Sequence, residues 1–270
     1  MTHAPPTLGS IRPRTMGFDF DPEKVPRHYM GGAAVPTAMT NALHLIFPKG
    51  ERFFVRSVRR FLDQVEPELR AQAKGFFGQE GRHAHEHERF FAIIRAHGYD
   101  VDRFLKIYEA VAYQFLERVF PAKMGLSVTV ALEHYTAIMA ENAFEAGLLE
   151  RVDPSVRALL AWHAAEEIEH KAVAFDVLQA VDDRYSLRMA GMAMATLALI
   201  GFWITGSTML LRQEKVGVRE VFRQLRELRK VNPIGRTVFL RGIREYLRRD
   251  FHPWDHDNLT LARDYLAKVD

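Results

Sequence analysis

Cysteine is absent from the 270 residues of this chain. Its absence excludes disulfide bonds, zinc–thiolate sites, iron–sulfur clusters and a cysteine nucleophile together, and it favours a reducing compartment. The first residues also lack the basic cluster and following apolar run that mark a signal peptide. We therefore expect a cytoplasmic protein, with association with the inner face of the membrane as the open alternative.

Strict alternation of apolar and polar residues, the pattern of a half-buried strand, is scarce as well. Many segments instead place apolar residues at positions i, i+3, i+4 and i+7, which is typical of amphipathic helices. This pattern predicts an all-α protein, specifically a ferritin-like four-helix bundle with one long crossover and additional C-terminal helices. We divide the chain into an extended N-terminal segment (1–33), a four-helix metal-binding bundle (34–185), and an apolar helix plus basic C-terminal helices packed on the bundle (186–270).

Proline, glycine and aspartate mark where the helices should begin and end. The sequence Phe47-Pro48-Lys49-Gly50 is expected to separate a short helix over 35–46 from a helix over 51–65. Further helices are predicted over 68–97, 101–120, 123–150 and 154–181. The helix over 101–120 belongs to the long crossover between the second and third bundle helices.

Two Glu-x-x-His elements stand out, Glu80 with His83 and Glu167 with His170. Residues three apart on a helix share one face, so each pair can bind the same metal centre. The spacing alone also arises by chance, so the order of the elements carries more weight. Di-iron carboxylate bundles take a glutamate from each of two helices and a Glu-x-x-His from each of the other two. With Glu51 and Glu133 included, the chain shows that set in the order Glu, Glu-x-x-His, Glu, Glu-x-x-His.

The positions of the predicted turns provide an independent test. Two residues of an antiparallel helix pair are level when the turn lies midway between them. The midpoint between Glu51 and Glu80 falls at the Glu66-Pro67 breaker, and the midpoint between Glu133 and Glu167 falls at residue 150, close to Asp153-Pro154. Both glutamate pairs are therefore expected to meet across their helix pairs.

The predicted metal ligands are Glu51, Glu80, His83, Glu133, Glu167 and His170, with His87 as a further imidazole. Four carboxylates and two imidazoles suit two iron ions or a manganese–iron pair, and zinc less well. Some members have alternative interpretations: Glu51 as a carboxylate at a helix start, and Glu80 with His83 as part of a solvated face. His134 and His163 are interpreted as partners of the ligands or as core histidines.

Several segments around these residues resemble a bacterial family of predicted metal-dependent hydrolases. They include Phe47-Pro48-Lys49-Gly50-Glu51, Leu132-Glu133-His134-Tyr135, the run from Trp162 to Asp176, and Phe251-His252-Pro253-Trp254. The resemblance spans about residues 14–257. It implies a metal-dependent enzyme and, by the family's name, a hydrolase.

Three functions follow as hypotheses. The first is a dinuclear enzyme, with iron as the expected metal, that activates O₂ to oxidise a small or lipid-like substrate and draws on an electron-donor protein. The second is the hydrolase that the family's name implies, driven by a metal-bound hydroxide, with Glu166 or His134 as proton shuttles. The third is a non-enzymatic, ferritin-like iron-binding protein. A homodimer is compatible with each.

Residues 189–211 contain no charged side chain, and the segment 212–249 that follows is strongly basic. The uncharged segment is long enough to cross a bilayer, but a core helix buried on all faces, or the apolar wall of a site for a lipid-like substrate, would look the same. The basic segment suits a membrane surface. No nucleic-acid-binding motif accompanies it, which argues against nucleic acid as a partner.

Overall fold

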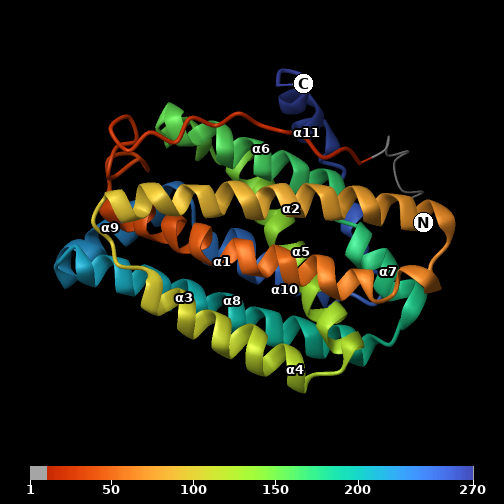
Figure 1. Cartoon of the computed structure of the whole chain (residues 1–270). Coiled ribbons are helices and arrows are strands. Elements are labelled where there is room, and N and C mark those ends of the chain that lie inside the picture. The colour runs from red at the N-terminus through yellow and green to blue at the C-terminus, as the bar shows by residue number, and fades with distance from the viewer. Residues whose placement is uncertain (1–10, 270) are drawn as a thin grey trace.

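The computed structural model describes residues 11–269, and the regular elements within this range are all helical, which confirms the all-α prediction (Figure 1). Four helical stretches surround the interior: α1 (Ala34–Arg59), α2 (Pro67–Ala96), α5 (Ala122–Glu145), and α6 (Pro154–His170) continued by α7 (Val173–Val181). Helix α1 packs on α2, α5 packs on α6 and α7, and the two pairs pack on each other. This arrangement brings the four predicted ligand-bearing segments around one interior.

The predicted break at Phe47-Pro48-Lys49-Gly50 is wrong, because α1 runs without interruption from Ala34 to Arg59 with Pro48 inside it. A proline in a helix interior removes one backbone hydrogen bond and crowds the preceding turn. Here Pro48 is buried, and α1 packs along its length on α2 and α8. Tertiary packing therefore outweighs the local preference for a break.

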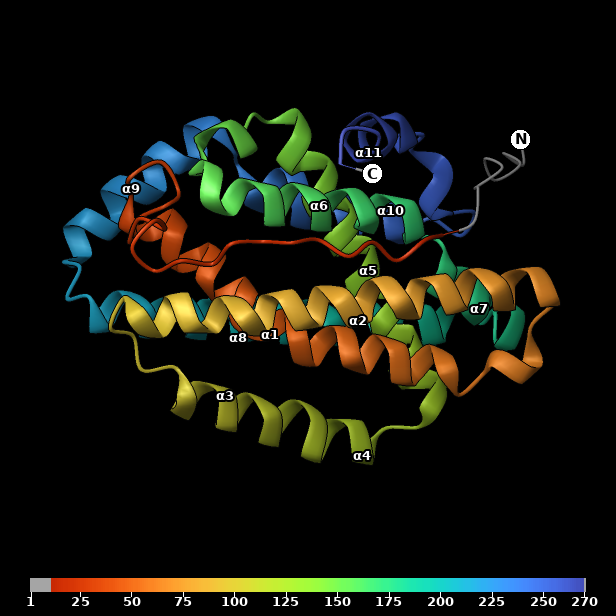
Figure 2. The same cartoon turned by 45° about the horizontal axis from the view of Figure 1, so that its top comes forward.

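The crossover between α2 and α5 is a helical rod lying outside the bundle (Figure 2). It consists of α3 (Asp102–Tyr108), a π-helical segment η2 (Glu109–Leu116) and α4 (Glu117–Val119), close to the predicted helix over 101–120. It packs beside helix α8 (Tyr185–Gln213), where the rings of Tyr108 and Phe202 lie 4.7 Å apart.

The helix predicted over 154–181 is interrupted between α6 and α7, at Lys171 and Ala172. The Lys171 ammonium is buried, donates hydrogen bonds of 2.7 Å to the His256 carbonyl and the Asn258 side chain, and lies 4.1 Å from the centre of the Trp254 ring. These contacts hold the C-terminal segment against the bundle immediately after His170.

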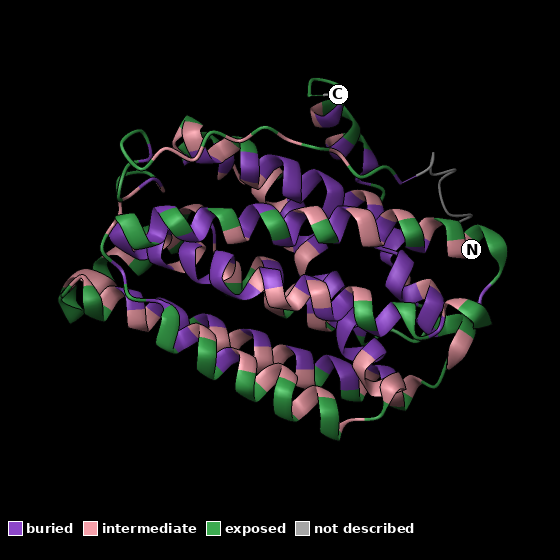
Figure 3. Ribbon diagram, in the orientation of Figure 1, coloured by how far each residue is buried: buried purple, intermediate pink, exposed green. Residues whose placement is uncertain are grey.

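The remaining C-terminal elements are α9 (Val218–Val231), the π-helical segment η4 (Gly235–Leu240), α10 (Arg241–Tyr246), the 3-10 helix η5 (Pro253–Asp255) and α11 (Leu259–Leu266). Helix α8 packs one face on α5 and α1, while its opposite face remains exposed, with Leu197 76% and Ile204 60% accessible (Figure 3). Only 28% of its most apolar window is buried, so it is not a core helix covered on all faces. By length and composition alone it could cross a membrane.

Replacing Gly191 by alanine should destabilise the protein, because the backbone of α8 lies close against α5 at this residue. A Cβ atom on Gly191 would lie 2.6 Å from the Ser127 carbonyl oxygen. We expect overpacking to cost about 1–3 kcal/mol, and thus to lower the Tm by several degrees in a calorimetric scan. Gly201 on the same helix has no atom within 4 Å of its Cβ position, so Gly201→Ala should be neutral or stabilising. Equal Tm values for the two variants would contradict the close approach.

Candidate metal centre

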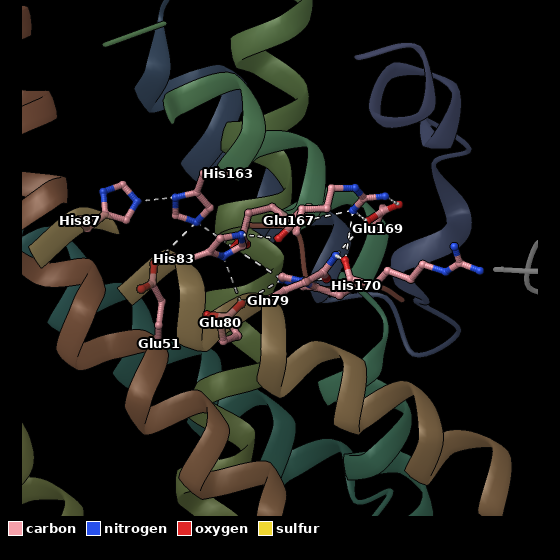
Figure 4. Close-up of polar contacts among 12 residues, drawn as sticks. Glu51, Gln79, Glu80, His83, His87, His163, Glu167, Glu169 and His170 are labelled. Atoms are coloured by element: carbon pink, nitrogen blue, oxygen red, sulfur yellow. Dashed lines mark hydrogen bonds and ion pairs between the residues drawn. The ribbon is translucent and has the colours of Figure 1, made fainter. Parts of the chain in front are cut away.

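The six predicted ligands meet in the interior of the bundle, and Figure 4 labels five of them, all except Glu133. They are Glu51 from α1, Glu80 and His83 from α2, Glu133 from α5, and Glu167 and His170 from α6. None exposes more than 3% of its surface. Burial of so many carboxylates at one place is unfavourable unless cations compensate for it.

The ligand-capable atoms fall into two groups, in each of which they lie within 4.8 Å of one another. The first group contains Glu51, His83 and His163, and the second contains Glu80, Glu133, Glu167 and His170. Each group therefore has the dimensions for one metal ion. His163, which the sequence placed among partners or core residues, belongs to the first group.

Two carboxylates connect the groups. Glu80 Oε1 lies 3.0 Å from Nε2 of His170 and 3.9 Å from Nδ1 of His83. Glu167 Oε1 lies 3.5 Å and 3.6 Å from the same two nitrogens. Both carboxylates thus lie between the two imidazoles, which is the position that a carboxylate shared by two metal ions requires.

His83 is oriented so that a bare nitrogen faces the carboxylates. Its Nε2–H donates to Glu166 Oε2 at 3.0 Å, and its Nδ1 is buried without a hydrogen-bond partner. Burial and the neighbouring His163 lower the pKa of His83 well below its usual value, so the imidazole is neutral. A neutral imidazole that donates through one nitrogen to a carboxylate is the usual form of a metal-bound histidine.

His170 is oriented in a similar way, with its two nitrogens exchanged. Its Nδ1–H donates to the Gln79 side-chain oxygen at 2.8 Å, and the amide of Gln79 in turn donates to Glu169 at 2.8 Å. The Nε2 atom of His170 faces Glu80, Glu133 and Glu167. Burial lowers the pKa of His170, but the adjacent carboxylates outweigh burial and raise it well above the usual value. A cation is therefore favoured at this nitrogen, whether a proton or a metal ion.

The carboxylates show the same deficit of positive charge. Both oxygens of Glu51, Glu80 and Glu133 are buried without a hydrogen-bond partner, and so is one oxygen of Glu167. Burial, with the charges of Glu80 and Glu167, raises the pKa of Glu51 and of Glu133 well above the usual value. Within residues 11–269 no lysine or arginine forms an ion pair with any of these glutamates. The residues present therefore fit metal ions, which would satisfy the orphaned oxygens directly.

The N-terminal segment runs across the bundle beside α2 and α6 and holds the partners of the ligands in place (Figure 2). Arg14 donates to Glu166 at 3.1 Å and to Glu169 at 2.7 Å. A Cβ atom on Gly78 of α2 would lie 2.2 Å from the Pro13 ring, so the segment lies directly on the helix. Glu166 thus connects Arg14 to His83 and faces away from the space between the two groups.

A row of histidines extends from the first group. His163 Nε2 lies 2.9 Å from Glu167 Oε1, its Nδ1 lies 2.6 Å from Nε2 of His87, and Nδ1 of His87 lies 2.6 Å from Nδ1 of His44. His87 is two helical turns, about 10 Å, beyond Glu80; it contacts His163 and joins neither ligand group. The spacing of four residues between His163 and Glu167 was the sequence signal for His163, because it places both on one face. His44 had no such signal.

His134 lies outside the cluster. Its Nε2 is 3.1 Å from the Gly242 carbonyl oxygen, and its ring packs on Tyr246 and Phe251. Successive residues on a helix point about 100° apart, so when Glu133 faces the cluster, His134 faces α10. The structure therefore does not bring His134 to the metal ligands, whereas Glu166, the other predicted proton shuttle, contacts His83.

The fold and this cluster together define an all-α protein with a buried carboxylate–histidine centre that could hold two metal ions. The chain belongs to the family described as predicted metal-dependent hydrolase, whose model matches residues 12–257. This confirms the resemblance seen in the sequence, and it supports a metal-dependent enzyme. Comparison with curated proteins and with solved structures gives no match, so the likeness to ferritin bundles remains a prediction.

Proposed function

We propose that this protein is a metal-dependent hydrolase with a dinuclear centre. Glu51, His83 and His163 would hold one ion, Glu133 and His170 the other, and Glu80 and Glu167 would be shared. The observation that carries the proposal is the set of orphaned carboxylate oxygens and inward-facing imidazole nitrogens at the meeting point of the two groups. The family description favours hydrolysis over the oxidation that the ligand pattern first indicated.

Access to the centre supports a catalytic role over a purely structural one. Glu51, His163 and Glu167 form part of the wall of a cavity that is otherwise mainly apolar. Two bound cations would supply activated water and polarise a carbonyl or phosphoryl oxygen. The chain's own residues would exclude bulk water, orient the imidazoles through Glu166 and Gln79, and place an apolar substrate beside the first group.

Oxidation of a lipid-like substrate with O₂ is the second candidate. The specific observation in its favour is the donor set, which contains four carboxylates and three imidazoles and no softer ligand. Such oxygen-rich sets suit iron and manganese, whose redox chemistry the apolar cavity would protect from water. An iron–iron or manganese–iron pair is the metal content that this candidate requires.

Reconstitution with single metals separates the candidates. Metal-free protein would be loaded anaerobically with Fe(II), Mn(II) or Zn(II) and assayed with p-nitrophenyl esters of short and long fatty acids, before and after addition of O₂. Ester turnover that needs metal and is indifferent to O₂ supports the hydrolase. Rapid O₂ consumption by the Fe(II) form without ester turnover would replace it with oxidation, and ferric mineral growth beyond two irons per chain would replace both with iron storage.

A further inference from the structure

Two separate cavities reach the candidate metal centre from different directions. We call them arm one and arm two. Their walls have four residues in common, Phe47, Thr136, His163 and Glu167. Two of these, His163 and Glu167, are ligand candidates, so the arms meet at the cluster itself.

Arm one lies between α1, the crossover, α5 and α8. Its wall is mostly aromatic and aliphatic, with Phe53, Phe54, Leu116, Val128, Leu199 and Phe202 among the lining residues. Along α1 it extends from Glu51 to Arg60, which is about 14 Å at the rise of an α-helix. Arg60 at its far end lies 3.8 Å from Glu117 in an ion pair, so this arm ends in a polar rim.

Arm two extends in the other direction, between α1, α5, α6 and residues 232–234, which follow α9. Its lining is still more apolar and includes Met39, Leu43, Met139, Leu149, Leu160 and Ile234. Along α5 it extends from Thr136 to Ala143, about 10 Å. Beyond the shared wall, the described lining of arm two has no charged side chain, and that of arm one has only the ligand candidate Glu51 at the centre and the Arg60–Glu117 pair at the far end.

We infer that the substrate is a long-chain ester whose reacting bond has hydrocarbon on both sides, with the acyl chain in one arm and the alkyl chain in the other. A substrate with one hydrocarbon chain and a polar group at its end would fill one arm and leave the other apolar arm empty. Apolar walls on both sides of the centre favour hydrocarbon there, because each buried methylene adds to binding. The assignment of the reacting bond rests on the proposed hydrolysis, whereas the two-sided binding does not.

The reaction balances without a further reactant. Water supplies a hydroxyl group to the acyl carbon, the bond between that carbon and the alkoxyl oxygen breaks, and the alkoxyl oxygen takes the remaining proton of the water. The products are a long-chain carboxylic acid in one arm and a long-chain alcohol in the other. Each product can leave along the arm that it occupies.

Blocking each arm separately tests the inference. Ala112→Trp narrows arm one and Ala143→Trp narrows arm two, because these alanines line one arm each. Ala193→Trp is the matched control, since Ala193 is exposed on α8 and lines neither arm. Met194→Trp and Met139→Trp serve as second variants for the two arms if an alanine variant fails to fold.

Binding is measured by displacement of the fluorescent lipid cis-parinaric acid from metal-free and metal-loaded protein, with decyl decanoate, methyl decanoate and decyl acetate as competitors. The unaltered protein should bind decyl decanoate at least about tenfold more tightly than either one-chain ester. Each arm variant should lose that preference, and the control should keep it. Equal affinity for the three esters, or a preference unchanged in both arm variants, would overturn the inference. If the preference persists while no ester is hydrolysed with any metal, the proposed function fails and two-sided binding stands.

Discussion

Replacing Glu133 by alanine should lower the metal content from about two ions per chain to one or none, while the helix content stays unchanged. Glu133 lies in the second group, 3.5 Å from Nε2 of His170, and both of its oxygens lack a protein partner. Its removal leaves the second group with Glu80, Glu167 and His170. The measurement is metal analysis of protein loaded with Fe(II) or Mn(II), together with circular dichroism.

In the metal-free protein, the same substitution should not lower the stability. A buried carboxyl group among other carboxylates is unfavourable, so metal-free Glu133→Ala should unfold at a temperature equal to or above that of the unaltered metal-free protein. Glu145→Ala, at an exposed position of the same helix, is the control and should retain both ions. Full metal content in Glu133→Ala would remove Glu133 from the ligand set.

Removal of the metals with a chelator should leave a folded protein whose stability falls as the pH rises from about 7 to 9. The pKa values of Glu51 and Glu133 are raised by burial and by neighbouring carboxylates, and that of His170 is raised by its carboxylate neighbours against the effect of burial. A group whose pKa is raised on folding stabilises the protein below its unfolded pKa, and this contribution is lost as the pH rises through the folded value.

The pH range of this measurement must lie above the usual histidine pKa of about 6.5, so that unfolded histidines are neutral throughout it. Burial lowers the pKa of His83 and His87, and lowers that of His44 to about 3. A lowered histidine pKa makes folding less favourable only where the unfolded residue would be protonated, so these three add no slope above that pH. Lys171 opposes the raised groups above about pH 8, because burial lowers its pKa to about 8 and a lowered lysine pKa adds stability as the pH rises. The comparison with metal-free Glu133→Ala, in which Lys171 is unchanged, isolates the raised groups.

Metal-loaded protein should behave in the opposite way, because metal ions bind deprotonated ligands and their affinity rises with pH. The difference in Tm between loaded and metal-free protein should therefore widen from pH 7 to pH 9, and calorimetry on both forms measures it. The metal-free Glu133→Ala protein should show a shallower slope, since one of the raised groups is gone. A difference that narrows over this range would contradict a carboxylate-rich metal centre.

Much of the candidate site could be predicted from spacing along the chain. A helix fixes the angle between residues three or four apart, so the two Glu-x-x-His pairs had to share faces. The turns at Glu66-Pro67 and Asp153-Pro154 bring Glu133 and Glu167 into one ligand group, and they bring Glu80 close enough for its charge to raise the pKa of Glu51.

Other features depended on neighbours that local spacing does not specify. Pro48 predicted a break that packing of α1 removed. His87 shares a face with Glu80 but lies too far along the axis, and it contacts His163 instead. Gln79, which orients His170, and Arg14, which holds Glu166, come from positions with no metal-ligand pattern.

The absence of cysteine, the helical periodicity and the order of glutamates and histidines are properties of the sequence by itself, and they determined an all-α chain with a carboxylate–histidine set. Only the tertiary structure decided that His163 joins this set, that His134 faces α10, and that two apolar arms meet at the cluster. The physical reason is that spacing fixes which side chains share a helix face. The rotation and contacts of packed helices decide what each face meets.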